Sequence, residues 1–190
     1  MGVTGVLGGV FDPPHVGHVA LARAAIEALG LDRLLVTVVA DPGHKATTTP
    51  VDTRLELARL AFAELPEVRV EVDGHARTVD SLEERGLEHP YFVLGADELA
   101  AFETWKSPHR VLELARLAVA MRPGVSRDDV AAVRERLAAG DRILEFDMEP
   151  VAVSSSEIRE RVARGQPVDG LVPPLVAAVI ERLGLYRSGE

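Results

Sequence analysis

Residues 3–18 read VTGVLGGVFDPPHVGH, a short apolar run that passes through two glycines and two prolines into the start of a helix. The apolar run at 3–8 lacks polar alternation, which is typical of a strand covered on both faces. Gly8 and Gly9 let the backbone turn sharply and approach a ligand with no Cβ between them. A helix beginning near Val16 would turn its free N–H groups toward this point, an arrangement that favours an anion by roughly 0.3–2 kcal/mol. The stretch therefore predicts a strand, a turn with an anion site, and a helix.

Apolar runs of the same kind alternate with amphipathic stretches along the rest of the chain. We predict further strands at 34–40, 68–72, 91–95, 117–121 and 143–146, and helices at 18–29, 51–65, 78–85, 108–115, 128–139, 156–164 and 173–183. This alternation favours a Rossmann-like, doubly wound α/β fold, a parallel sheet with helices on both faces. We expect one domain over 1–190, in which a helical C-terminal part from about 150 to 190 packs against the sheet. Ligands in such folds bind at the carboxyl ends of the strands.

Composition excludes several classes of function. The chain has 190 residues, no cysteine and a net charge of −9. Disulfides, thiol nucleophiles and cysteine metal sites are therefore excluded, and non-specific binding to nucleic acid or anionic membranes is disfavoured. No apolar run approaches the roughly 20 residues of a membrane helix, and the N-terminus does not resemble a signal peptide. We expect a cytoplasmic protein with no nucleic-acid or membrane partner, and the sequence leaves a homo-oligomer open.

Two histidines follow the turn. His15 and His18 are three residues apart, so they lie on one face of the first helical turn. Two imidazoles and the free backbone amides of a helix start, all directed at one point, would stabilise a phosphate whose negative charge increases during a reaction. The spacing alone also fits half of a metal site, although a third ligand is missing, or two surface histidines without function.

The whole string GGVFDPPHVGH resembles the HxGH signature of the adenylyltransferase superfamily. Its fuller form, GGxFDPxHxGH, resembles nicotinate-nucleotide adenylyltransferases and, more loosely, phosphopantetheine adenylyltransferases. The resemblance implies that His15 and His18 are catalytic and stabilise the α-phosphate of ATP and the departing pyrophosphate. It also implies that Gly8, Gly9 and Phe11 lie at the ATP. No protein nucleophile is implied, because the acceptor's own phosphate attacks.

Two later segments add to this resemblance. Residues 153–159, VSSSEIR, resemble the family's ISSTxIR motif, and residues 94–97, LGAD, resemble its GAD segment. Helix capping would explain one of the serines, and a plain turn would explain Gly-Ala-Asp. The resemblance implies more, namely ATP contacts from Gly95, Asp97, Ser154, Ser155, Ser156 and Arg159. It places the serine turn and Arg159 at the β- and γ-phosphates, and Arg159 is predicted to be catalytic.

The acceptor side matches the family less closely. Asp41-Pro42-Gly43-His44-Lys45 resembles a PPHK segment with Gly43 in place of a proline, and Arg77-Thr78 stands where the family has an aromatic residue and threonine. A solvated loop, a helix cap and core packing are the ordinary explanations for Lys45, Thr78 and Trp105. The resemblance implies that these three residues bind the acceptor, with Trp105 stacking on its base.

The resulting hypothesis is that the protein transfers the adenylyl group of ATP to nicotinate mononucleotide. The products would be nicotinate adenine dinucleotide and pyrophosphate, in NAD biosynthesis. Mg²⁺ is expected to accompany ATP, and we predict no metal site built from the chain's own side chains. Two alternatives stay open: another phosphate acceptor, such as nicotinamide mononucleotide or phosphopantetheine, and a nucleotide-binding module without catalysis.

Overall fold

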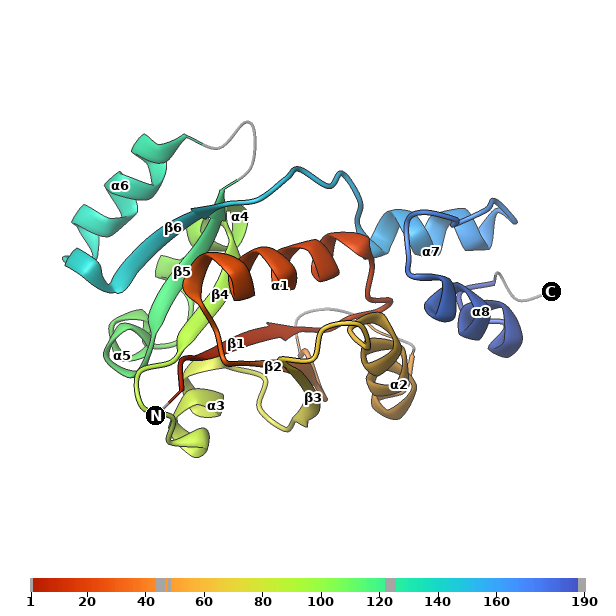
Figure 1. The fold of residues 1–190 in the computed structure, drawn as a ribbon, viewed down its shortest axis with the longest axis horizontal. Helices are drawn as coiled ribbons and strands as arrows, with labels where there is room; N and C mark the ends of the chain where they lie inside the picture. Colours follow the sequence, from red (N-terminus) through yellow and green to blue (C-terminus); the bar gives the residue numbers. More distant parts are fainter. Residues whose placement is uncertain (1, 44–46, 48, 122–125, 188–190) are drawn as a thin grey trace.

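The computed structural model describes residues 2–43, 47, 49–121 and 126–187, so the predicted acceptor residue Lys45 lies outside the described residues. Within these ranges six parallel strands form one sheet in the order β3-β2-β1-β4-β5-β6. The strands are β1 (Thr4–Gly9), β2 (Arg33–Val39), β3 (Val68–Asp73), β4 (Tyr91–Gly95), β5 (Arg116–Met121) and β6 (Ile143–Asp147). Figure 1 shows the sheet with its flanking helices. The predicted parallel sheet is confirmed.

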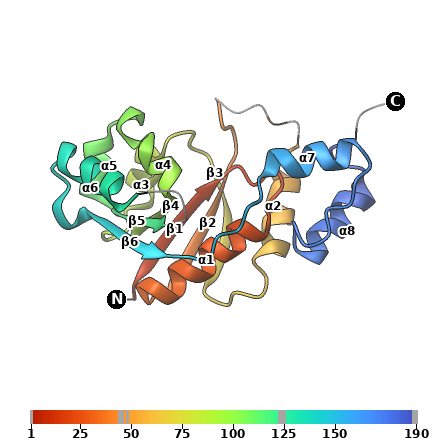
Figure 2. The same cartoon turned by 90° about the horizontal axis from the view of Figure 1, so that it is seen from above.

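Helices cover both faces of this sheet (Figure 2). The α-helices are α1 (Val16–Leu29), α2 (Val51–Ala61), α3 (Thr78–Arg85), α4 (Ala96–Ala100), α5 (Pro108–Leu114), α6 (Arg127–Arg136), α7 (Ser155–Ala163) and α8 (Pro174–Leu183); two short 3₁₀ helices are η1 (Phe102–Thr104) and η2 (Gly140–Arg142). Alternate residues of a strand point to opposite faces. Leu34 and Val36 of β2 therefore pack with α1 and α2, whereas Leu35 packs in the second core with α3, α4, α5 and α6.

The strand order reverses beside β1, which places the topological switch point between β1 and β4. β1 pairs with β2 over six residues but with β4 only at Gly5–Tyr91 and Val6–Phe92. Pairing between β1 and β4 thus ends before their carboxyl ends. Gly8 is exposed although its strand lies in the middle of the sheet. A doubly wound fold binds ligands at this point, so the fold itself singles out the turn after β1.

The C-terminal part corrects one expectation. Residues 148–154 have no regular secondary structure, and a parallel bridge joins Asp169 to Val172 between α7 and α8, so this part is not purely helical. Helix α8 packs mainly on α2 rather than on the sheet. The reason is geometric: α2 already covers that face, and Val176 and Ile180 of α8 extend its core outward. Figure 1 shows α7 and α8 together at one end of the molecule.

Element boundaries differ from the sequence prediction in a few places. The helix predicted over 51–65 ends at Ala61, and the helix predicted over 128–139 ends at Arg136. The short helix α4 was not predicted, because Gly95-Ala96-Asp97 was interpreted as a turn at the ligand. These differences leave the strand ends unchanged, and the strand ends position the site.

Candidate active site

The two histidines lie side by side at the start of α1. Their imidazole rings stack with centroids 3.7 Å apart and an interplanar angle of 22°. The backbone N–H of His15 donates to Nδ1 of His18 at 3.2 Å, so the neutral His18 ring carries its proton on Nε2. The neighbouring Phe11 ring lies edge-on against His18 at 5.0 Å. One face of the first turn therefore presents both imidazoles together, as the spacing predicted.

His15 is buried, and its Nδ1 has no hydrogen-bond partner among the described residues. Burial lowers the pKa of His15 from its ordinary value of 6.5 to about 4, because the buried imidazolium loses its solvation. At neutral pH the free protein therefore holds His15 as a neutral imidazole. A phosphate anion placed beside this ring would favour its protonated form.

The glycines of the turn have different functions in the packing. A Cβ on Gly9 would lie 2.8 Å from the Phe11 ring, and a Cβ on Gly17 would lie 3.1 Å from His15 Nδ1. Both glycines therefore make room for the turn's own rings. A Cβ on Gly8 would make ordinary contacts, 3.4 Å from Thr37 Oγ1 and 3.7 Å from the Phe92 ring. Protein packing does not explain the glycine at position 8.

Phe11 itself is only 2% exposed and packs against Phe62 as well as His18. Its ring packs against His18 and is covered by the surrounding core. The contact between Phe11 and ATP therefore stays a prediction, and the burial of the ring leaves the backbone of Phe11 as the part that would make it.

The serine and arginine motif meets this turn from the other end of the chain. Ser155 Oγ donates to the Pro13 carbonyl at 2.8 Å, and Arg159 Nη1 donates to the Asp12 carbonyl at 2.6 Å. Ser154 is the N-cap of α7, and its Oγ accepts from the Glu157 amide at 3.1 Å. Two motifs more than 140 residues apart thus form one surface. The N-termini of α1 and α7 both lie there, each with helical amides that favour an anion.

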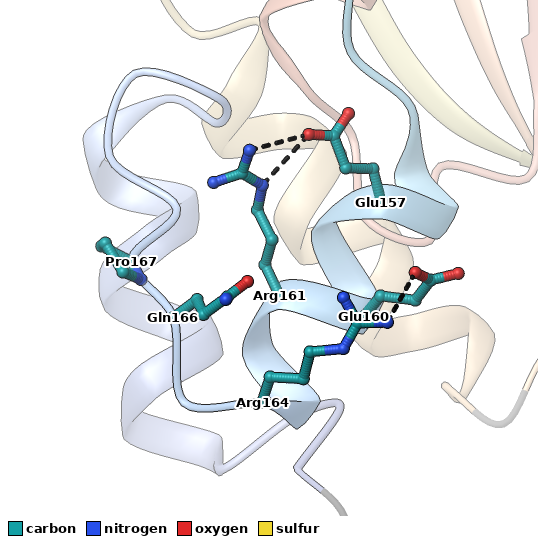
Figure 3. A pocket seen from close by; sticks show the side chains of 6 residues that line it. All are labelled: Glu157, Glu160, Arg161, Arg164, Gln166 and Pro167. Carbon is teal, nitrogen blue, oxygen red and sulfur yellow. Dashed lines mark hydrogen bonds and ion pairs between the residues drawn. The ribbon is translucent and has the colours of Figure 1, made fainter.

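Arg159 also donates from Nη2 to Ser156 Oγ at 3.2 Å. The more distal charges of α7 pair with one another instead: Arg161 bonds Glu157 and Arg164 bonds Glu160 (Figure 3). The hollow that they line with Gln166 and Pro167 does not include Arg159. The guanidinium of Arg159 is therefore the one from α7 that faces the histidine turn.

A buried arginine that the sequence analysis missed holds the strand ends. Arg54 of α2 is 1% exposed and donates to the carbonyls of Val10, Val39, Ala40 and Thr49 at 2.8–3.1 Å. Burial lowers the pKa of Arg54, while the charge of nearby Asp12 opposes that shift. The guanidinium thus fastens the ends of β1 and β2 to the loop before α2. The sequence signal that could have identified Arg54 is the presence of an arginine within the apolar repeat of 51–65.

The remaining predicted ATP residues lie across the switch point. Gly95 ends β4 and is the N-cap of α4, and Asp97 is exposed in the first turn of that helix. The Phe92 ring lies under Gly8 and meets Trp105 edge-on at 6.0 Å. One aromatic ring thus links the predicted ATP side to the predicted acceptor side.

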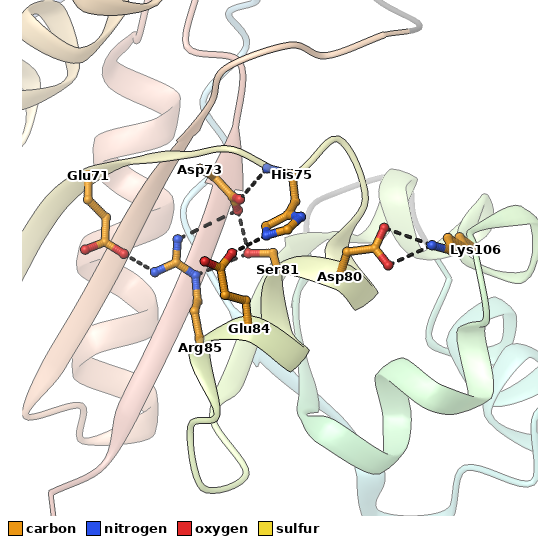
Figure 4. A network of polar contacts seen from close by, with 8 residues as sticks. All are labelled: Glu71, Asp73, His75, Asp80, Ser81, Glu84, Arg85 and Lys106. Carbon is orange, nitrogen blue, oxygen red and sulfur yellow. Dashed lines mark hydrogen bonds and ion pairs between the residues drawn. The ribbon is translucent and has the colours of Figure 1, made fainter.

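Trp105 is half-buried and also packs against Phe102, with ring centroids 5.2 Å apart. Thr78 begins α3, and Lys106 forms an ion pair with Asp80 of the same helix at 2.7 Å (Figure 4). This pair joins the Thr78 and Trp105 segments. Nearby, Asp73 at the end of β3 accepts from Ser81 of α3. The segments that carry the predicted acceptor residues Thr78 and Trp105 are therefore linked by this ion pair.

No group of three or more His, Cys, Asp or Glu that could hold a metal ion occurs within the described ranges. In those same ranges no helix is long and apolar enough to cross a membrane.

Comparisons with known proteins agree with this geometry. Residues 6–161 match the cytidylyltransferase-like family model, so the fold and site define a nucleotidyltransferase-type domain. The chain is 37% identical over 193 residues to a protein of Roseiflexus sp. (strain RS-1) named "Probable nicotinate-nucleotide adenylyltransferase", covering 96% of this chain and 97% of that one. A Thermus thermophilus protein of the same name is 38% identical over 192 residues, covering 96% and 98%. This chain belongs to the nicotinate-nucleotide adenylyltransferase family.

Solved structures support the fold. The Plasmodium falciparum nicotinic acid mononucleotide adenylyltransferase complexed with NaAD superposes with a TM-score of 0.80 at 16% identity, covering 98% of both chains. The Rossmann-like arrangement is thus shared over the full length of the two proteins.

The two glycines of the turn give a matched pair of predictions. We expect Gly8→Ala to keep its stability but to lower kcat/KM for ATP about tenfold or more, because its methyl group displaces the ligand. We expect Gly9→Ala to lower the free energy of unfolding by about 1–3 kcal/mol, because the buried Phe11 ring cannot move away. Urea unfolding and steady-state kinetics on both variants measure this. A Gly8→Ala protein with parental kinetics would show that no ligand approaches this backbone.

The burial of His15 predicts a titration that depends on ligand. In the free protein its imidazole should titrate near pH 4, and bound ATP should move the midpoint upward. The unfolded chain binds this proton at about its ordinary pKa of 6.5, so His15 destabilises the free protein as the pH falls from 6.5 toward 4. NMR of the imidazole carbons, assigned with His15→Asn, measures both midpoints. A free-protein midpoint at 6.5 would contradict the burial argument.

Proposed function

We propose that this chain transfers the adenylyl group of ATP to nicotinate mononucleotide, releasing pyrophosphate and forming nicotinate adenine dinucleotide. The observation that carries the proposal is the joining of the two phosphate motifs. Ser155 and Arg159 of α7 are hydrogen-bonded to the Pro13 and Asp12 carbonyls, directly before the histidine pair. Imidazoles, hydroxyls, helical amides and one guanidinium then surround the place where a triphosphate would lie.

The chemistry requires no protein nucleophile. A phosphate oxygen of the acceptor attacks the α-phosphorus of ATP, and the bond from that phosphorus to the β-phosphate's bridging oxygen breaks. The electron pair leaves with pyrophosphate. The His15 and His18 N–H groups would stabilise charge on the α-phosphate and the leaving group, and Arg159 with the Ser154, Ser155 and Ser156 turn would hold the β- and γ-phosphates. Catalysis is then positioning and charge stabilisation.

Mg²⁺ would accompany ATP and neutralise part of the phosphate charge. Because the described residues offer no cluster of carboxylates for it, the phosphates and water would supply most of its ligands. Gly8, Gly9, Gly95 and Asp97 complete the proposed nucleotide contacts at the two strand ends.

On the acceptor side, Trp105 and Thr78 provide the proposed contacts. The Trp105 ring is held by Phe92 and Phe102 with part of its surface exposed, which suits stacking on a pyridine ring. Lys45 is proposed to meet the acceptor phosphate. A cytoplasmic location agrees with the absence of cysteine.

Pyrophosphate release tests the proposal. Purified protein is given ATP and Mg²⁺ with nicotinate mononucleotide, nicotinamide mononucleotide or phosphopantetheine in parallel. We expect release with nicotinate mononucleotide and formation of the dinucleotide. Release with one of the other acceptors only would overturn the acceptor assignment. ATP binding by calorimetry without release for any acceptor would indicate a binding module instead.

A further inference from the structure

The carboxyl group of Asp12 lies beneath the histidine turn and joins three distant parts of the chain. Asp12 is 5% exposed. Its Oδ1 accepts from the Tyr186 hydroxyl at 2.6 Å, and its Oδ2 accepts from the Thr47 hydroxyl at 2.6 Å. Its backbone carbonyl accepts from Arg159 at 2.6 Å. One residue therefore receives hydrogen bonds from the tail after α8, from the loop between β2 and α2, and from α7.

The donor Tyr186 is itself held in place. It is half-buried and adopts a left-handed backbone, with φ at 63°. Burial, and next the hydrogen bond to Asp12, raise the pKa of Tyr186 well above its ordinary value of 10.0. The hydroxyl therefore keeps its proton at every working pH and acts as a donor. Because a buried carboxyl group needs such donors, the tail is part of the local structure of the turn.

The second donor, Thr47, comes from the loop between β2 and α2. Thr47 follows the segment of the predicted acceptor residue Lys45 and ends on the carboxyl group bonded by Tyr186. Asp12 in turn lies three residues before His15. A shift of either hydroxyl would therefore reach the imidazole pair and the Arg159 contact through a single residue.

We propose that Tyr186 and Thr47 are positioning residues for adenylyl transfer, which hold the Asp12 carboxyl group and so fix the histidine pair and Arg159. This inference rests on the proposed function for its kinetic test. In this proposal neither the Tyr186 nor the Thr47 hydroxyl contacts the substrate. Losing one donor leaves an oxygen of a buried carboxyl group unsatisfied, and the turn that carries the phosphate-stabilising groups relaxes.

The central experiment compares two Tyr→Phe variants, since the chain has two tyrosines. Tyr186→Phe removes only the hydroxyl that Asp12 accepts. Tyr91→Phe is the matched control: Tyr91 begins β4 at the far end of the sheet, and within the described residues its hydroxyl has no hydrogen bond. We expect Tyr186→Phe to lower kcat about tenfold and to change the KM for ATP less than about threefold. The reason is that the variant loosens the histidine pair and Arg159 without removing a group that binds ATP. Tyr91→Phe should keep both.

Thr47→Val tests the same carboxyl group from its other oxygen and provides a second variant. We expect Thr47→Val to lower kcat by a similar factor. In the Thr47→Val/Tyr186→Phe double variant, the total fold-decrease in kcat should be smaller than the product of the two single decreases, because both hydroxyls act through Asp12. A purely structural role would change the melting temperature and leave kcat at 25 °C unchanged. Parental kcat in both single variants would overturn the inference.

A readout without substrate separates this inference from the proposed function. Hydrogen exchange of the backbone amides should be faster in residues 16–19 in Tyr186→Phe, where the His18 and Val19 amides donate to the His15 carbonyl. The Tyr91→Phe protein should match the parent there. If the parent fails to use nicotinate mononucleotide, the proposed function fails. Unchanged exchange in Tyr186→Phe would refute the positioning role whatever the acceptor.

Discussion

Replacing His15 by alanine is expected to lower kcat by about a hundredfold or more, the loss typical of one group that stabilises developing charge. The His15 ring stacks on His18 at 3.7 Å and is buried with an unpartnered Nδ1 among the described atoms. Burying an imidazole nitrogen without a hydrogen-bond partner lowers the stability of the fold. This cost indicates that His15 is present for function rather than for stability. In the proposed reaction, His15 would stabilise a phosphate that gains charge in the transition state. Pyrophosphate release at saturating ATP and acceptor measures the change.

Two further variants sharpen this test. His15→Asn places a good N-cap residue at the start of α1 and keeps a neutral N–H donor, so its activity should lie between that of His15→Ala and that of the parent. His89→Ala is the matched control, since His89 lies beyond α3 at the opposite end of the sheet and its ring is hydrogen-bonded to Arg142, at 3.5 Å. His15→Ala should melt within about 4 °C of the parent. Near-parental kcat in a folded His15→Ala protein would remove His15 from the mechanism.

Much of the site could be predicted from sequence because its parts are local. The run from Gly8 to His18 contains its own strand end, turn and helix start, and periodicity with the glycines and prolines was enough to predict all three. The serine turn before Arg159 was equally local. In both cases short-range chemistry and the fold agree, so the expected element is the observed one.

What sequence reasoning missed depends on contacts across the chain. Nothing in the pattern of 51–65 says that Arg54 turns inward, because its four acceptors come from three other segments. The hydrogen bond from Tyr186 to Asp12 spans 174 residues. The docking of α8 on α2 likewise follows from which face was already covered. Such contacts are set by topology, which periodicity does not encode.

Replacing Arg54 by methionine is expected to lower the free energy of unfolding by about 3–5 kcal/mol, because a buried charged group that donates four hydrogen bonds is removed. The side chain is 1% exposed, and its donors satisfy the carbonyls of Val10, Val39, Ala40 and Thr49. Methionine fills a similar volume but leaves those carbonyls without the guanidinium as donor, and this loss accounts for most of the expected cost. The carboxyl ends of β1 and β2 should loosen together.

The control is on the same helix. Arg59 of α2 is exposed and has no ion pair or hydrogen bond to any described residue, so Arg59→Met should change stability by no more than about 0.5 kcal/mol. Arg54→Lys should lie between the two, because lysine keeps the charge but not the planar fork that reaches several carbonyls. Urea unfolding gives all three free energies, and a loss below about 1 kcal/mol in Arg54→Met would contradict the argument.

Because Val10 directly precedes the turn that carries His15, the Arg54→Met substitution should lower kcat even at temperatures where the protein stays folded. Stability and the proposed catalysis would then be coupled through the Arg54 guanidinium, which holds the strand ends that carry the proposed phosphate site.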